Sequence, residues 1–260
     1  MRKKIVAGNW KMNMDLNEGV ALATEINNQF NASSLEDKEV ILCTPFIHLG
    51  TVSGLIDAPG VSVGAQNCND HKSGAYTGEI SAAMIRSTGA GNVIIGHSER
   101  RSLYSETDDL LAAKTAEALR NGLRVIFCCG EVLAERESGN HFEVVKRQLE
   151  KGLFMLPAED FRNCIIAYEP VWAIGTGVNA KPADVIRAAK TIRSQLAHLY
   201  GKKAAEGVQV LYGGSVTADS AADYLALIDI DGLLVGGASL DEFAFSEIVK
   251  KAHRGKGVTK

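Results

Sequence analysis

The chain has 260 residues, of which 46% are hydrophobic, and its net charge at neutral pH is −3. This length and apolar content suit one large buried core, so we expect residues 1–260 to form a single domain. The nearly balanced charge and the lack of a long basic run argue against a nucleic-acid partner. No run of 18 apolar residues occurs, so neither a membrane span nor a membrane partner is expected.

Five cysteines are spread over the chain, and they form no Cys-x-x-Cys motif. Three of them lie in apolar, strand-like runs, where cysteine behaves as a small hydrophobic residue. The odd number without a motif favours reduced thiols and therefore a reducing compartment. The N-terminus also lacks the apolar stretch of a signal peptide, so we predict a cytoplasmic protein.

Short apolar runs with little polar alternation recur along the chain, and such runs are typical of parallel strands that are buried on both faces. They comprise residues 5–7, 40–43, 61–65, 93–95, 125–129, 165–168, 208–211 and 232–235. Helical signals lie between them. Asp15 and Glu18 fit a capping box, and residues 107–120 carry an apolar stripe. Pro182 suits the first turn of a helix through residue 196, and Thr217 can cap a segment through residue 227.

Eight strands that alternate with helices over this length predict an α/β protein with a closed (β/α)8 barrel. An open doubly wound sheet is the competing fold. In such a sheet a glycine-rich turn would follow the first strand, but Gly8, Asn9, Trp10 and Lys11 stand there instead. Residues 175–180 match G-x-G-x-x-A, yet they do not directly follow a predicted strand, so we interpret the match as chance.

The carboxyl ends of barrel strands face one shared mouth, so residues that follow different strands can form one site. Asn9 and Lys11 follow the first predicted strand, and Lys11 offers a positive charge to a phosphate or an oxyanion. His97 follows the fourth, before a predicted helix start at Ser98 and Glu99. The positive end of that helix should lower the pKa of His97, so that a neutral imidazole can donate to a substrate carbonyl. A surface lysine and a packed structural histidine are the competing interpretations.

Glu169 follows the sixth predicted strand and precedes an apolar segment. Pro170 restricts the backbone at the start of this segment, and Gly175 and Gly177 allow it to move at the end. Proline fixes its own φ and favours an extended residue before it, whereas glycine adopts dihedrals closed to other residues. A proton-transfer group under such a cover suits chemistry that must exclude water, although a packed hydrophobic loop is the plainer alternative. The predicted lid consists of Pro170, Val171, Trp172, Ala173, Ile174, Gly175, Thr176 and Gly177.

Paired glycines follow the last two predicted strands, at residues 213–214 and 236–237. Glycine lets backbone N–H groups approach a phosphate closely, and the helix starts expected after both pairs favour an anion. The loops after strands seven and eight are where barrels commonly bind phosphate. The six histidines form no metal-binding motif, so no metal is expected. No lysine stands where a Schiff-base nucleophile would be expected, which argues against an aldolase.

Five segments of the chain together resemble the triosephosphate isomerase family, in the same order along the sequence. They are residues 8–13, 95–101, 167–177, 212–215 and 234–239. The resemblance implies interconversion of dihydroxyacetone phosphate and glyceraldehyde 3-phosphate, without a cofactor or a metal. Another phosphosugar-binding barrel enzyme, such as an aldolase, and a non-catalytic barrel are the alternatives.

The resemblance also implies roles for single residues. Glu169 would move the proton between C1 and C2, and His97 would polarise the carbonyl group. Lys11 and Asn9 would stabilise the enediolate, with Glu99 in a supporting role. The backbone N–H groups that would bind the phosphate belong to Gly175, Ser215, Gly236 and Gly237.

Residues 66–79 form a connection that is too long for an ordinary βα loop. In the resembled family this loop docks into a partner subunit, with the position of Thr77 near the partner's active site. Met14 matches a position that receives the partner's loop. We therefore predict a two-fold homodimer, with a flexible lid as the alternative role for the loop. The paired Cys128 and Cys129 depart from the family pattern, and we expect looser packing and greater sensitivity to oxidation there.

Overall fold

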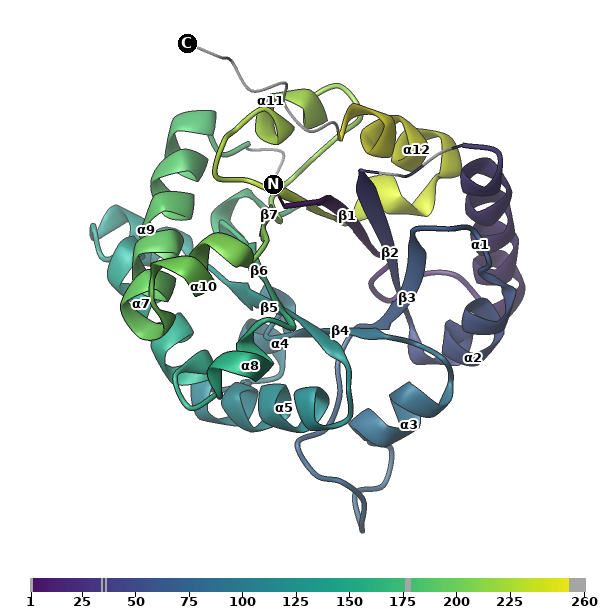
Figure 1. Cartoon of the computed structure of the whole chain (residues 1–260), viewed down its shortest axis with the longest axis horizontal. Coiled ribbons are helices and arrows are strands. Elements are labelled where there is room, and N and C mark those ends of the chain that lie inside the picture. The colour runs from purple at the N-terminus through teal and green to yellow at the C-terminus, as the bar shows by residue number, and fades with distance from the viewer. Residues whose placement is uncertain (1, 34, 36, 176–178, 253–260) are drawn as a thin grey trace.

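The computed structural model describes residues 2–33, 35, 37–175 and 179–252. Eight parallel strands close into a barrel in which each strand pairs with the next and β8 pairs with β1 (Figure 1). This confirms the predicted closed barrel and excludes the open sheet. The strands are β1 (Lys4–Asn9), β2 (Lys38–Thr44), β3 (Val61–Ala65), β4 (Asn92–Ile95), β5 (Arg124–Cys129), β6 (Cys164–Tyr168), β7 (Val210–Tyr212) and β8 (Gly232–Val235).

Helices surround the barrel as an outer ring (Figure 1). They are α1 (Leu16–Asn31), α2 (Phe46–Leu55), α3 (Ala82–Ser87), α4 (Ser98–Leu103), α5 (Asp108–Arg120), α6 (Leu133–Glu137), α7 (His141–Leu153), α8 (Ala158–Phe161), α9 (Pro182–Tyr200), α10 (Lys202–Gly207), α11 (Ala221–Leu225) and α12 (Glu242–Lys251). Two short 3-10 turns, η1 (Val171–Ala173) and η2 (Gly237–Leu240), follow β6 and β8. Within the described residues, every helix falls short of the length and apolarity that crossing a membrane requires.

Apolar side chains alternate between the two sides of the barrel wall, because successive residues of a strand point to opposite faces. Inside the barrel, Ile5 and Ala7 of β1 belong to a small cluster of mostly aliphatic side chains. Val6 of the same strand belongs to the larger core between the strands and the helices. Strands that are apolar on both faces therefore build two cores, which explains why the sequence shows so little polar alternation.

Local sequence signals account for several of the helix boundaries. Asp15 and Glu18 form the predicted capping box at the start of α1, and Pro182 occupies the first turn of α9. Thr217 was predicted to cap a helix, and that prediction is wrong. Its hydroxyl accepts the Ser220 N–H at 3.3 Å in a turn, and α11 begins only at Ala221. A hydroxyl residue serves a turn as readily as a helix start, so the sequence did not separate the two.

Candidate active site

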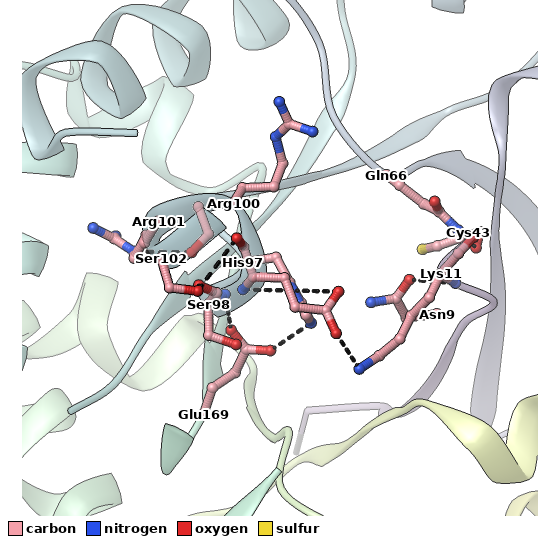
Figure 2. Close-up of polar contacts among 12 residues, drawn as sticks. Asn9, Lys11, Cys43, Gln66, His97, Ser98, Arg100, Arg101, Ser102 and Glu169 are labelled. Atoms are coloured by element: carbon pink, nitrogen blue, oxygen red, sulfur yellow. Dashed lines mark hydrogen bonds and ion pairs between the residues drawn. The ribbon is translucent and has the colours of Figure 1, made fainter. Parts of the chain in front are cut away.

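Four residues from the ends of three strands meet at the carboxyl end of the barrel. Asn9 ends β1, Lys11 follows two residues later, His97 comes after β4, and Glu169 comes after β6 (Figure 2). All four line one cavity of about 250 Å³. The structure therefore brings together four of the five residues predicted to take part in the chemistry. Glu99, the fifth, lines the neighbouring groove and contacts Lys11.

Glu169 is only 2% exposed and has two polar partners. One carboxylate oxygen lies 2.9 Å from His97 Nε2, and the other accepts the Ser98 backbone N–H at 2.9 Å (Figure 2). A Cβ at Gly130 would overlap the Glu169 carbonyl oxygen, so glycine lets β5 approach the acid closely. Burial by itself would raise the pKa of Glu169, but His97, the Ser98 N–H and Lys11 outweigh burial, so the pKa is lowered.

His97 stands at the N-cap of α4, as the sequence predicted. Its Nδ1 accepts the Glu99 backbone N–H at 3.2 Å, so that nitrogen carries a lone pair and Nε2–H points at Glu169. Burial by itself would lower the pKa of His97. The Glu169 carboxylate and, to a lesser degree, Glu99 raise it by more than burial lowers it, so the net shift is upward. The predicted lowering is therefore wrong. The sequence argument included the helix end and omitted a carboxylate in direct contact with the ring.

Lys11 is held in an uncommon backbone conformation at the mouth of the cavity. Its φ of 53° is left-handed, and for a residue other than glycine this costs about 1–3 kcal/mol. The Lys11 N–H donates to Asn9 Oδ1 at 3.1 Å, and Gln66 Nε2 donates to the Lys11 carbonyl at 2.9 Å. Its Nζ lies 2.6 Å from Glu99 Oε1. Both the backbone and the ammonium group of Lys11 are therefore held by contacts within the protein.

The predicted phosphate-binding residues Gly175, Ser215, Gly236 and Gly237 line the same cavity. The η2 turn begins at Gly237, as expected for an anion site after β8. No helix follows the glycine pair after β7 until Ala221, so the helix start predicted there is absent from this described stretch. The Ser215 N–H and hydroxyl both donate to the Ala173 carbonyl, at 3.3 Å and 2.7 Å.

The predicted lid lies over this cavity as far as it is described. Residues 171–173 form η1, and Ile174 lines the cavity. The Trp172 indole N–H donates to Glu131 Oε1 at 2.8 Å, and the Arg136 guanidinium lies 4.4 Å from the centre of the Trp172 ring. Thr176 and Gly177 lie outside the described residues.

Sequence reasoning missed Glu131, which is 1% exposed and anchors the start of the lid. Besides the Trp172 N–H, it accepts the Tyr168 hydroxyl at 3.1 Å. It directly follows Gly130 at the end of β5, and a carboxylate at a strand end near the mouth was the available signal.

Metal and thiol chemistry can be examined across the described part of the chain. No group of three or more His, Cys, Asp or Glu residues there has the arrangement to hold a metal ion. All five cysteines are free and buried. Burial raises the pKa of Cys129 to about 12 and that of Cys128 well above its usual range. Burial and a raised pKa both disfavour the thiolate, which is the reactive form, so these features argue against the predicted sensitivity to oxidation, which stays a prediction.

A wider groove of about 590 Å³ adjoins the 250 Å³ cavity and shares Asn9, Lys11 and His97 with it. Its other walls include the apolar residues Phe46, Ile80, Leu103 and Tyr104. The long connection after β3 projects beyond the ring of helices, and Thr77 on it is exposed (Figure 1). Met14 is half-buried and has a left-handed φ of 70°.

Comparison with known proteins identifies the family of this arrangement. The family model described as Triosephosphate isomerase matches residues 4–252, which extend from β1 to the end of α12. The chain belongs to the triosephosphate isomerase family. Relatives named triosephosphate isomerase include proteins of Bacteroides fragilis (53% identical over 249 residues), Porphyromonas gingivalis strain W83 (52% over 250) and Corynebacterium glutamicum (44% over 253). Each alignment covers 96% of this chain and 98–99% of the relative.

Membership of the triosephosphate isomerase family agrees with the resemblance found in the five sequence segments. The match is not confined to one motif, because it covers all eight strands and the loops between them. The residues singled out in those loops are also the residues that the barrel gathers at one cavity.

Proposed function

We propose that the chain interconverts dihydroxyacetone phosphate and D-glyceraldehyde 3-phosphate through an enediolate, with no cofactor or metal. The observation that carries this proposal is the meeting of a buried carboxylate, an imidazole and an ammonium group at one cavity bounded by glycine-rich loops, in a member of the triosephosphate isomerase family. Such a set supplies a base, a hydrogen-bond donor and a positive charge, which proton transfer next to a carbonyl requires.

Glu169 is the group that moves the proton. Its pKa is lowered, so the carboxylate is ionised near neutral pH and can accept a proton from carbon. It takes a proton from C1 of dihydroxyacetone phosphate and returns it to C2. The hydroxyl hydrogen on O1 passes to O2 in the same conversion, so that the aldehyde forms at C1 and the new hydroxyl at C2. In doing so, the carboxylate exchanges its present contact with His97 for the substrate carbon.

His97 and Lys11 stabilise the charge that develops on oxygen. The Glu99 N–H on Nδ1 fixes the tautomer of His97, so that Nε2–H is the donor available to a substrate oxygen. Once Glu169 engages substrate, the contact that raises the pKa of His97 is removed, which favours the neutral ring. Lys11 supplies a fixed positive charge, and Asn9 holds the Lys11 backbone N–H.

The phosphate and the lid occupy the other side of the cavity. The N–H groups of Gly175, Ser215, Gly236 and Gly237 are the proposed phosphate donors. An enediolate phosphate can lose its phosphate group in water, so a cover is part of the chemistry. Ile174 already lines the cavity, and Trp172 is tied to Glu131 at the lid's first turn.

A coupled assay of glyceraldehyde 3-phosphate isomerisation, with and without a chelator, tests this function. We expect full activity in the chelator and incorporation of solvent deuterium at C1 of dihydroxyacetone phosphate during turnover. Turnover without deuterium entry would exclude the enediolate route. The aldolase alternative predicts a covalent adduct after borohydride treatment with substrate, and we expect none by mass spectrometry.

We further propose that the protein is a homodimer and that it works in the cytoplasm. The wide groove beside the site and the exposed, projecting loop with Thr77 offer surfaces for a second copy of the chain, and Met14 lies in the β1–α1 connection near that groove. The five free, buried cysteines are consistent with a reducing compartment. Sedimentation equilibrium should give twice the chain mass, and a fully active monomer would contradict the dimer.

A further inference from the structure

His48 is a buried polar side chain that the proposed chemistry does not use. It belongs to α2, is 0% exposed, and lies outside both the catalytic cavity and the adjoining groove. Its Nε2 is 2.8 Å from the Asp15 carbonyl oxygen. A carbonyl only accepts, so Nε2 carries the proton and donates to Asp15. That carbonyl also accepts the Gly19 N–H at 3.0 Å, which is the first hydrogen bond of α1.

The same ring contacts Trp10, the residue immediately before Lys11. The two ring centroids are 5.8 Å apart and the planes meet at 74°, which is a favourable edge-to-face arrangement. Trp10 is fully buried, and its indole N–H has no hydrogen-bond partner among the described residues. Packing, rather than a hydrogen bond to the indole, therefore orients the Trp10 ring.

Gly19 supplies the space for this contact. A Cβ at Gly19 would come within 2.5 Å of His48 Cδ2, so only glycine admits the ring at this point of α1. Glycine inside a helix is unfavourable, because it lowers the helix propensity and loses more entropy on folding. The sequence keeps this unfavourable residue at the one place where the imidazole approaches the helix.

His48 thus holds both ends of the segment from Trp10 to Asp15. Within that segment Lys11 and Met14 both have left-handed backbones without being glycine. Conformations of this kind persist only where the surroundings impose them. Asn9 and Gln66 hold Lys11 from one side. On the other side, the contacts of His48 fix the residue before Lys11 and the start of α1.

We propose that His48 is a positioning residue for Lys11: by contacting Trp10 and Asp15 in the space left by Gly19, it fixes the strained segment that aims the Lys11 ammonium into the cavity. This inference rests on the proposed role of Lys11 in binding and catalysis. It predicts that changes at His48 or Gly19 reduce activity only through Lys11.

The test is a double-mutant cycle with Lys11→Met. His48→Phe keeps the ring and removes the donor, and Gly19→Ala displaces the ring. A displacement near 1 Å can cost on the order of 100-fold. These changes act on Lys11 indirectly and should displace it by less, so each should lower kcat/KM by about ten-fold. In the Lys11→Met background the same changes should alter kcat/KM by less than about two-fold, because residues that act through one another are non-additive.

Further variants separate positioning from general destabilisation. His48→Gln retains an N–H donor and should recover part of the lost activity. Val52→Ala on the same helix is the matched control, because Val52 is fully buried and has no part in the contacts of the loop. It should lower the unfolding temperature without changing kcat/KM. Inhibition by inorganic phosphate should weaken in Gly19→Ala and His48→Phe and stay unchanged in Val52→Ala.

Three results would overturn the inference. One is a loss of kcat/KM that is equal with and without Lys11. Another is unchanged kcat/KM and phosphate inhibition in both Gly19→Ala and His48→Phe. The third is that Lys11→Met alone retains full activity, which would refute the role of Lys11 as well. Failure of the proposed function is thus visible in the single Lys11 variant, separately from failure of the His48 inference. If His48→Phe does not fold, Gly19→Ala and His48→Gln carry the same comparison.

Discussion

Replacing Glu169 by aspartate keeps the charge and withdraws the carboxylate by one methylene group, about 1.5 Å. Both of its hydrogen bonds, to His97 and to the Ser98 N–H, are 2.9 Å long. Without a compensating shift they would lengthen to about 4.4 Å, beyond hydrogen-bond range. A displacement near 1 Å costs on the order of 100-fold, so we expect kcat to fall at least that much, or about 2.7 kcal/mol in the activation barrier.

The assay is steady-state isomerisation in both directions, with KM and kcat determined separately. The loss should lie in kcat, because the proton transfer is affected and the phosphate contacts are not. Glu39→Asp is the matched control: Glu39 lies on β2 and pairs with Arg124, and it does not line the catalytic cavity. An unchanged kcat in Glu169→Asp would show that Glu169 is not the base. Equal losses in both variants would attribute the effect to folding.

Lys11→Met should raise KM and lower kcat together, by about ten-fold or more in kcat/KM, because it removes the fixed positive charge at the cavity; a change in unfolding temperature alone would make Lys11 structural. The contact between Glu169 and His97 should stabilise the fold most from about pH 4.5 to 6.5. The lowered pKa of Glu169 gives a contribution that is present above 4.5 and lost as pH falls through the folded-state pKa. The raised pKa of His97 gives one that is complete below 6.5 and lost as pH rises through its folded-state pKa. The difference in unfolding temperature from Glu169→Gln should peak in that window, and a pH-independent difference would contradict the pairing. Iodoacetamide should leave all five thiols of the native protein unmodified by mass spectrometry, and rapid labelling of Cys128 or Cys129 would show that they are accessible.

The strands were predictable because burial on both faces makes each one a continuous apolar run, and only β7 began later than expected, at Val210. Val208 belongs to the apolar run but is the C-cap of α10, and its carbonyl accepts a hydrogen bond from Arg193. An apolar run marks burial, and burial continues past the end of a strand. Local patterns therefore locate the strands but define their ends less well.

The members of the candidate site were predictable because a barrel gathers its strand ends, but their mutual contacts were not. The sequence placed His97 at a helix start and Glu169 at a strand end, and it gave no sign that the two would lie 2.9 Å apart. That contact, together with Glu99, reverses the expected shift in the pKa of His97. Glu131 and His48 were missed for the same reason, because their roles depend on neighbours remote in sequence.

The hydrogen bond between Ser215 and Ala173 has a consequence for how the lid moves when substrate binds. The Ser215 N–H that we assign to the phosphoryl group is already engaged by the lid's own carbonyl. One N–H group cannot donate well to both the Ala173 carbonyl and a phosphate. A bound phosphate must therefore displace Ala173, and with it part of the lid, from Ser215. The phosphate group of the substrate would then break the hydrogen bond that holds the lid. A ligand without the anionic group would leave the hydrogen bond between Ser215 and Ala173 intact. Selectivity for phosphorylated trioses would then come from this hydrogen bond as well as from the cavity.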